Sequence, residues 1–458
     1  MAMTDWTIIR RSMRARLFST VTTALTVAVA VALLFTLLVM RDSGRRAFAR
    51  GSGNMHMLVS ADASPMVSVL NSVYYANPPR RFISWAKYQE ITRRFPLEFA
   101  IATQIGDSFR GQPVLATSPE LFTKFQPTPG EPWKFAAGAA MREGEAGLWD
   151  VVVGSQAARA TGLKMGDKLS LTHGASTSRE PGHVHTKFSY TVVGILETTG
   201  SAHDRALFCR IEASWLMHAF DRHELEEARE AEAAKAAAIA KGETPKAEEH
   251  DHDHEHADEP LPTMADLTDE DRKITGVYLR LITRAGSDVP ANLAQVFTML
   301  RSDASIQVAQ PAEEINKLMA IVGNVDQILV GMAAVVMVSS GIAIMLALYN
   351  SMEQRRRQIA ILRVLGCSRP RVFGLVVTEA AIVGMIGAVA GVLLGMGGAA
   401  ITAEIMRARV GLVIEPMPSV EIVPLLVLGT VLLGAVAGVI PAMMAYGTPV
   451  AKNLRPVG

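Results

Sequence analysis

Four long apolar runs stand out against a mixed pattern of polar and apolar positions. They cover residues 17–40, 328–349, 372–403 and 422–446. A helix rises 1.5 Å per residue, so each run is long enough to cross about 30 Å of hydrocarbon. The pattern predicts four transmembrane helices. A cleaved signal peptide is the alternative for the first run, but no small-residue cleavage pattern follows it, which favours an uncleaved anchor.

The chain between the first two runs, residues 41–327, has a different pattern. Apolar residues alternate with polar ones in short segments that predict strands at 149–154, 187–196, 277–282 and 305–310. Helical patterns at 118–125 and 311–325 alternate with them. The fold class predicted is therefore a membrane protein with four transmembrane α-helices and a large α+β domain inserted between helices 1 and 2.

A long helix is predicted from Ile211 to Ala240 in this domain. It begins with the core-like residues Trp215, Leu216 and Phe220 and then becomes almost pure Ala, Glu, Lys and Arg. Its far end has no apolar face to bury, so we expect it to project into solvent. The helix leads into an Ala/Glu/His-rich insertion at about 215–265.

Basic residues in the short loops predict the orientation of the spans. Residues 350–371 carry six arginines against one acid, Glu353, which places this loop in the cytoplasm. The basic tail at 447–458 is also predicted to be cytoplasmic. The more acidic loop at 404–421 is predicted to lie on the opposite side of the membrane. By parity the N-terminal segment, residues 1–16, is inside and residues 41–327 are outside. The two cysteines, Cys209 and Cys367, then lie on opposite sides of the membrane and cannot pair.

The cytoplasmic loop at 350–371, here called the elbow segment, combines helix and turn signals. Glu353 and Arg357 are four residues apart and can pair on one helical face. An apolar stripe follows, and Gly366 is the expected helix stop because it adopts positive φ at little cost. Helix, glycine and helix in about 20 residues can pass force from a cytoplasmic partner into the third span. The alternative is a basic topology anchor with no further role. The stripe comprises Ile359, Ile361, Leu362, Val364 and Leu365.

Two further features belong to the membrane part. The N-terminal helix at 5–18 has Trp6, Ile9, Met13 and Leu17 on one stripe and arginines opposite, so we expect it on the inner membrane surface. Glu379 is the one Asp, Glu, Lys, Arg or His within the four apolar runs. An ion relay usually needs several such groups, so a structural partner for the elbow arginines is favoured over a transport ligand.

Glycines recur at intervals of four in the last two spans. Small residues at this spacing allow helix backbones to approach closely, although membrane helices are glycine-rich in general. We therefore predict helix-packing positions at Gly387, Gly391, Gly395, Gly434 and Gly438.

A run of histidines alternates with acids in "EEHDHDHEHADEP". Neutral imidazole and carboxylate suit zinc, copper or nickel, whereas the alternative is a solvated, low-complexity loop. The run supplies candidate metal ligands, zinc among them, at His250, His252, His254 and His256.

Composition narrows the functional classes. The 458 residues are 49% apolar and 19% charged, with a net charge of +1, so nothing favours a nucleic-acid partner. Two cysteines provide no disulfide framework. The sequence contains no Gly-Lys dipeptide and hence no G-x-x-x-x-G-K-[ST] phosphate loop, so ATP hydrolysis by that route would need another subunit.

The sequence resembles a known family at three places. "MEQRRRQIAILRVLGCSRPRVFGLVVTEA" is similar to the hallmark of the FtsX-like permeases of ABC systems, which include MacB-type and LolC/LolE-type proteins. "IPAMMAYGTPVAKNLRP" resembles the family's C-terminal end. "VVVGSQAARATGLKMGDKLSL" and "YTVVGILETTGSAHDRALF" resemble the MacB-like periplasmic core domain.

The resemblance implies a permease subunit without an enzyme activity of its own. It implies a homodimer of permeases in the bacterial inner membrane, with the α+β domain in the periplasm. A separate cytoplasmic ATPase would hold ATP and Mg and contact the elbow segment. The resemblance also allows a periplasmic or outer-membrane partner. The work would be mechanotransmission to a lipoprotein, peptide or other envelope substrate. Residues expected to couple the ATPase are Glu353, Arg355, Arg356, Arg357, Ile361, Leu362, Arg363, Leu365 and Gly366.

Two alternatives remain open at this point. The first is a non-transporting, FtsX-like regulator of an envelope enzyme. The second is a zinc-linked transport component that uses the histidine run, but no His or Cys lies within the apolar runs to form a conduction path.

Overall fold

The computed structural model describes residues 5–173, 183–184, 187–240, 263–410 and 421–447. These residues form two compact units. One comprises Met1–Arg46 with Leu318–Gly458 and contains the long helices, and the other is Ala47–Lys317. The histidine run at 250–256 lies outside the described residues.

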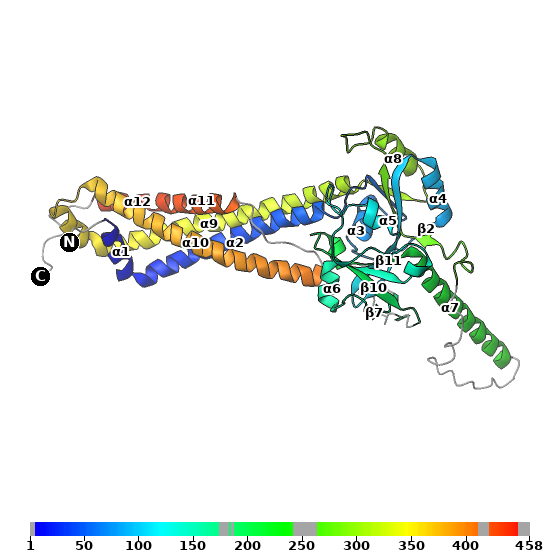
Figure 1. Cartoon of the computed structure of the whole chain (residues 1–458). Coiled ribbons are helices and arrows are strands. Elements are labelled where there is room, and N and C mark those ends of the chain that lie inside the picture. Colours follow the sequence, from blue (N-terminus) through cyan, green and yellow to red (C-terminus); the bar gives the residue numbers. More distant parts are fainter. Residues whose placement is uncertain (1–4, 174–182, 185–186, 241–262, 411–420, 448–458) are drawn as a thin grey trace. The chain divides into compact units, whose positions relative to one another are not determined.

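A mixed β-sheet organises the α+β unit (Figure 1). Its strands follow the order β14-β1-β13-β3-β4-β11-β6-β10-β5, with β7, β8 and β9 attached at the side. The β6–β10 and β4–β11 pairs are parallel, and the other pairs are antiparallel. The strands are β1 (Met57–Ser60), β3 (Leu97–Phe109), β4 (Gln112–Thr117), β5 (Phe135–Gly138), β6 (Asp150–Val153), β7 (Lys168–Leu169), β8 (Thr172–His173), β9 (His183–Val184), β10 (Tyr190–Leu196), β11 (Leu207–Arg210), β13 (Gly276–Leu281) and β14 (Gln307–Ala309).

Local sequence explains several of these elements. Strand β10 alternates buried and half-buried residues along its length, as a strand with one face on the core requires. Strands β3 and β4 form a hairpin closed by Arg110 and Gly111. Both residues have positive φ, of 47° and 80°, which is the geometry of a two-residue turn that matches the twist of the strands.

The helices of the α+β unit are mostly short. Ser64 caps α3 by accepting a hydrogen bond from the Val67 backbone N–H, and Pro65 occupies its first turn. Ser84 caps α4 in the same way. These helices are α3 (Pro65–Ser72), α4 (Trp85–Arg94), α5 (Glu120–Lys124), α6 (Ser155–Thr161), α7 (Ile211–Ala240) and α8 (Leu293–Arg301); a two-stranded sheet of β2 (Ile83–Ser84) and β12 (Lys273–Ile274) and two 3₁₀ turns, Glu145–Gly147 and Ala202–Arg205, complete the unit.

Helix α7 has the bounds that its sequence predicts, Ile211–Ala240. Its first turns bury Trp215, Leu216 and Phe220 in the main core. The rest extends away from the sheet, as Figure 1 shows. The apolar start therefore anchors the helix, and its charged continuation has no core to join.

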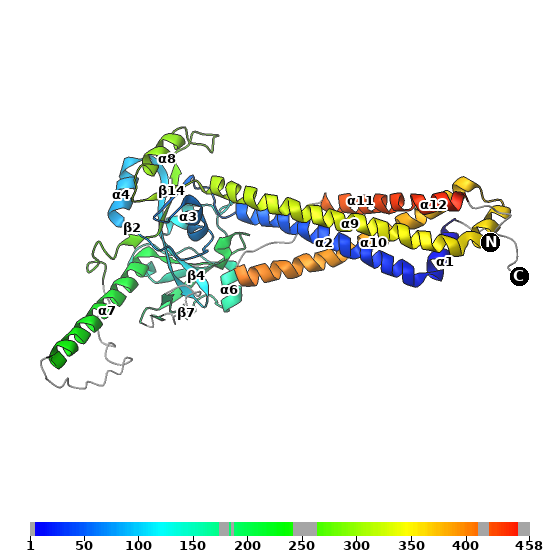
Figure 2. The ribbon, with the colours of Figure 1, turned by 180° about the vertical axis from the view of Figure 1, so that it is seen from behind.

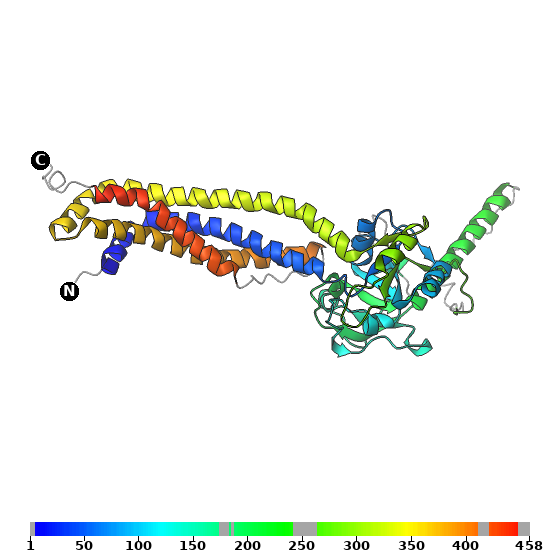
Figure 3. The ribbon, with the colours of Figure 1, turned by 90° about the horizontal axis from the view of Figure 1, so that it is seen from above.

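The membrane unit contains α1 (Asp5–Ala15), α2 (Leu17–Ala49), α9 (Pro311–Val364), α10 (Arg369–Val410), α11 (Ile422–Ala437) and α12 (Val439–Tyr446). Its long helices run alongside one another in Figures 2 and 3. Within the part of the chain that the structure describes, four stretches are long and apolar enough to cross a membrane: Leu17–Arg46, Pro311–Met352, Arg369–Met406 and Ile422–Tyr446. Side chains from α2, α9, α10 and α11 share one apolar cluster.

Three helical predictions need correction. The segments predicted separately at 311–325 and 328–349 belong to one helix, α9, because no proline lies between them; the same helix continues through 350–364, as predicted. The last span is two helices, because the ring of Pro441 clashes with the carbonyl of Ala437, four residues earlier, where α11 ends. The N-terminal helix predicted at 5–18 is shorter, since α1 ends at Ala15 and Leu17 already begins α2.

Candidate functional site

The elbow segment turns through a complete C-terminal cap. Gly366 has φ +94°, in the left-handed region that favours glycine. Its N–H donates to the carbonyl of Arg363 at 3.1 Å, and the N–H of Cys367 donates to that of Leu362 at 3.0 Å. These two bonds define a Schellman motif, which satisfies carbonyls that the helix end would leave unpaired. Helix α9 therefore ends by a definite turn, and α10 begins three residues after Gly366.

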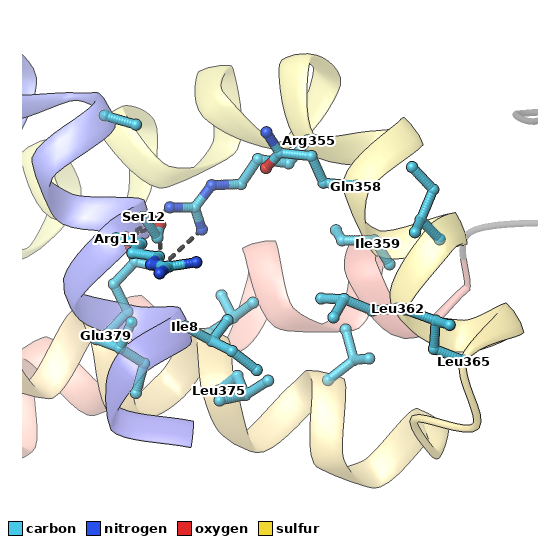
Figure 4. A pocket seen from close by; sticks show the side chains of 15 residues that line it. Ile8, Arg11, Ser12, Arg355, Gln358, Ile359, Leu362, Leu365, Leu375 and Glu379 are labelled. Carbon is cyan, nitrogen blue, oxygen red and sulfur yellow. Dashed lines mark hydrogen bonds and ion pairs between the residues drawn. The ribbon is translucent and has the colours of Figure 1, made fainter. Parts of the chain in front are cut away.

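Glu379 of α10 is the centre of a buried ion-pair cluster. Its carboxylate accepts two hydrogen bonds from Arg355 of α9, at 2.6 and 2.7 Å. Arg16, between α1 and α2, donates a third at 2.8 Å, and the Ser12 hydroxyl of α1 lies within 3.2 Å. The cluster thus joins residues from three separate parts of the chain, and Figure 4 shows the part formed by Ser12, Arg355 and Glu379.

The cluster carries more positive than negative charge. Two guanidinium groups face one carboxylate, and the side chains of Arg355, Arg16 and Glu379 are only 12%, 17% and 5% exposed. Desolvating such groups is costly, so each charge depends on its partners. Glu379 is the one carboxylate that pairs with these arginines among the described side chains, so its removal would leave both cations without that partner.

A groove of about 430 Å³ adjoins this cluster. Helix α1, the end of α9 and the start of α10 form its walls (Figure 4). Most of the lining is aliphatic, with Arg11, Ser12, Arg355, Gln358 and Glu379 as the polar members. The aliphatic residues are Ile8, Ile9, Ala15, Ile359, Ile361, Leu362, Leu365, Val372, Leu375 and Val376.

The residues predicted to couple a partner have different positions. Ile361, Leu362 and Leu365 all line the groove, but Ile361 and Leu365 are 45% and 77% exposed, whereas Leu362 is half-buried. Arg356 is exposed and Arg363 half-buried. The side chains of Glu353 and Arg357 lie outside those that the structure describes, and their pairing stays a prediction.

An exposed ion pair also ties α1 to α10. Arg371 donates two hydrogen bonds to one oxygen of Asp5, at 2.6 and 3.0 Å. Both side chains are 51% exposed. Exposed ion pairs contribute little to the free energy of unfolding, so this contact should add little to the stability of the packing between α1 and α10.

The glycines of α10 lie against α2. A Cβ added at Gly387, Gly391 or Gly395 would come within 2.7 Å of an α2 side chain. The three α2 residues that they meet are Val27, Val31 and Phe35, which have the same spacing of four. The absence of a side chain is therefore what permits this close approach.

A second glycine contact joins α10 to α11 and α12. Gly384 and Gly434 approach each other, with the carbonyl of Ala380 only 2.9 Å from a Cβ built on Gly434. A Cβ on Gly438 would meet the Cβ of Ala380 at 2.6 Å. Helix α10 thus packs closely on two sides.

Two buried polar arrangements were not predicted from the sequence. The first is the part that Arg16 and Ser12 play around Glu379; a basic residue at the head of the first span was the available signal. The second is a buried histidine, His203, in the segment "GSAHDRALF".

His203 connects the start of the α+β unit to its core. Its Nδ1 lies 2.7 Å from the Tyr75 hydroxyl and its Nε2 lies 3.0 Å from the carbonyl of Gly51. Nε2 must donate to that carbonyl, so Nδ1 accepts from Tyr75 in a neutral ring. Phe125, Trp133 and Phe208 pack around the ring, and this burial lowers the pKa of His203 to about 4.

Metal chemistry finds no support among the residues that the structure describes. No group of three or more His, Cys, Asp or Glu side chains there could hold a metal ion. The predicted ligands at 250–256 fall in a stretch that the structure does not describe.

Comparison with known proteins gives two domain matches. Residues 330–450 match the FtsX-like permease C-terminal family, and residues 20–243 match the MacB-like periplasmic core domain. Together they cover most of the chain. The first includes the elbow segment and Glu379, and the second includes His203.

A curated relative gives the same assignment. An uncharacterized ABC transporter permease of Methanocaldococcus jannaschii is 22% identical over 172 residues. The match covers 36% of this chain and 42% of the relative, so the chain spans less than half of that protein's length. From the two domain matches and this similarity, the chain belongs to the FtsX-like, MacB-type family of ABC transporter permeases.

Proposed function

We propose that this chain is a mechanotransmitting permease subunit. Membership of the family implies a partner ATPase. ATP hydrolysis by that partner would move the elbow segment, and the long helices would carry the movement to the α+β unit. The substrate, an envelope lipoprotein or peptide for example, would be acted on outside the membrane and need not pass between the helices.

The orientation follows from charge. Arginines at six positions of the elbow segment favour the cytoplasm, so Ala47–Lys317 would lie outside, between the first and second spans, in the periplasm of an inner-membrane protein. The six arginines are Arg355, Arg356, Arg357, Arg363, Arg369 and Arg371.

The Glu379 cluster is the observation that carries the proposal. Arg355 is nine residues before the end of α9, and its two hydrogen bonds to Glu379 connect that end to α10. Arg16 connects the same carboxylate to the head of α2. A displacement of the elbow segment would therefore reach two spans directly, rather than be absorbed by a loose loop.

The glycine contact provides the next step. Because the α10 glycines pack directly against α2, movement of one helix would displace the other. Helices α2 and α9 extend at Ala47–Ala49 and Pro311–Lys317 into the α+β unit. These two helices are the continuous routes by which force would enter that unit.

The exposed apolar residues of the elbow segment are the proposed ATPase contact. Ile361, Val364 and Leu365 are 45%, 62% and 77% exposed at the end of α9. Neighbouring exposed apolar side chains of this kind mark interaction surfaces. Arg356 is exposed on the same helix.

Substitution at this surface tests the coupling. Leu365→Glu should abolish stimulation of the co-purified ATPase by the permease in reconstituted vesicles, while the chain stays folded because the side chain is largely exposed. Ile282→Glu, at a similarly exposed position of the α+β unit (59%), is the matched control and should leave stimulation unchanged. Full stimulation in the Leu365→Glu protein would overturn the proposal.

Cys367 tests the orientation without an engineered residue. It is half-buried at the elbow, whereas Cys209 is fully buried and should not react. A membrane-impermeant maleimide should label the protein only after the cell membrane is opened. Labelling of Cys367 in cells whose outer membrane is permeabilised but whose inner membrane is intact would place the elbow segment outside. That result would contradict the proposed coupling to a cytoplasmic ATPase.

A further inference from the structure

The groove beside Glu379 has the two parts that an amphiphile requires. Ile8, Ile359, Leu362 and Leu375 are among the residues of an aliphatic wall that extends along α1, α9 and α10. Arg11 and Arg355 contribute guanidinium groups to the same groove. A long hydrocarbon chain matches the wall, and an anion matches the guanidinium groups.

The charge balance indicates which sign the ligand carries. Among the side chains that the structure describes, Glu379 neutralises one of the two arginines that it contacts, so Arg16 and Arg355 together leave one positive charge in excess. Arg11 adds another at the exposed side of the groove. A desolvated excess of guanidinium favours an anionic partner, and phosphate accepts the paired hydrogen bonds that arginine offers.

The location supports a lipid rather than a soluble molecule. The groove lies where an amphipathic helix, α1, meets the ends of two helices able to span a membrane. Basic pockets between such helices, and basic residues on interfacial helices, bind the headgroups of anionic lipids. An acyl chain would enter the groove from the bilayer without crossing water.

We propose that this groove binds an anionic phospholipid. Its phosphate contacts Arg11 and lies close to the positive charge of Arg355, and one acyl chain lies along the aliphatic wall. The bound lipid fills the space between α1, the end of α9 and the start of α10, and so supports the position of the Glu379 cluster. The inference needs only that the four long helices lie in a bilayer, so its failure would leave the proposed coupling to an ATPase untouched.

Lipid retention by the full-length protein is the test. The purified chain is incubated with phosphatidylglycerol or with phosphatidylcholine, and retained lipid is counted by native mass spectrometry. Phosphatidylglycerol should be retained in preference. Equal retention of the two lipids would overturn the anionic assignment.

Two neighbouring arginines provide a matched comparison. Arg11→Ala should lower phosphatidylglycerol retention by roughly fivefold, the effect of losing one arginine contact at a membrane surface. Arg10→Ala removes the same charge from the same exposed helix but does not touch the groove, and should leave retention unchanged. Equal losses in the two variants would show only diffuse electrostatic attraction and would overturn the site.

The acyl chain is located separately. A phosphatidylglycerol with a photoactivatable acyl chain should cross-link to the groove residues Ile8, Leu362 or Leu375. Leu375→Trp, which fills the groove, should remove these cross-links while the protein keeps its elution volume and helical circular dichroism. Cross-links confined to other faces of α9 and α10, or replacement of the lipid by the ATPase subunit in the assembled complex, would overturn the proposal.

Discussion

The two units bury their polar centres in different ways. In the membrane unit, Glu379 stays paired with two arginines from other parts of the chain. In the α+β unit, His203 is enclosed by aromatic rings and is satisfied as a neutral group by Tyr75 and Gly51. The first arrangement depends on a charge balance that one substitution can break. The second is a packed core in which the polar group is neutral and needs no counter-charge.

Removing the carboxylate should have the largest effect. Glu379→Gln leaves two buried guanidinium groups uncompensated and should cost about 3–5 kcal/mol of stability. Thermal unfolding of the chain in detergent measures the loss. Asp5→Asn, which breaks the exposed pair with Arg371, should cause no measurable change. Similar unfolding temperatures for both variants would show that the buried cluster has no special role.

Acidification should act on the other polar centre. Unfolded histidine binds a proton near pH 6.5, but burial lowers the pKa of His203 to about 4 in the folded chain. Between these values the unfolded state binds more protons, so stability present above pH 6.5 is lost as the pH falls toward 4. The loss should reach roughly 3 kcal/mol.

Comparing the wild type with a His203→Gln variant isolates the contribution of His203 to the pH dependence of stability. His203→Gln keeps an amide donor for Gly51 but does not titrate. Tryptophan fluorescence, to which the adjacent Trp133 contributes, should report unfolding that is less dependent on pH in the variant than in the wild type. Parallel pH profiles would rule out His203 as the source.

Helix packing should be affected next. Gly391→Ala places a Cβ 2.6 Å from that of Val31 and 2.7 Å from the carbonyl of Ala28, so α10 must shift. The expected cost is about 1–3 kcal/mol. Gly397→Ala, on the same helix with open space around it, should be neutral or slightly stabilising. If both variants unfold at one temperature, the close approach of α2 and α10 does not contribute.

The elbow turn should show the smallest change in stability. Gly366→Ala puts an L side chain at φ +94°, which costs about 1 kcal/mol, although no atom lies within 4 Å of the added Cβ. Gly366→Asn should recover part of the loss, because asparagine tolerates left-handed geometry. Chemical denaturation followed by circular dichroism would rank the three proteins. A stable alanine variant would mean that the turn is not required.

Periodicity predicted much of the fold. The helix at 211–240, the strands around 150, 192 and 279, and the beginning of the first span at Leu17 all have strong local patterns. Continuity was harder to predict, since the helical pattern at 311–325 and the apolar run at 328–349 were separate predictions, yet α9 passes through both. No proline lies between them, so the helical hydrogen bonding can continue.

The candidate site was predictable only in part. The stop at Gly366 is encoded locally, so the sequence indicates it. The partners of Glu379 are not, because Arg16 is 363 residues away along the chain and only the packing of α1 against α10 brings it there. The arginine-rich pattern of the elbow segment suggested Arg355 among several candidates. It could not distinguish the buried arginine from the exposed Arg356.

The matched spacing of the glycine contact has a mechanical consequence. If α10 moved along α2 by one turn, about 6 Å, Gly391 and Gly395 would take the places of Gly387 and Gly391 opposite Val27 and Val31, but Ala399 would take the place of Gly395 opposite Phe35. A Cβ at that place lies only 2.7 Å from the Phe35 ring, so Phe35 would have to move. The end of the glycine series at residue 395 therefore favours the present register of the two helices and opposes sliding by a whole turn.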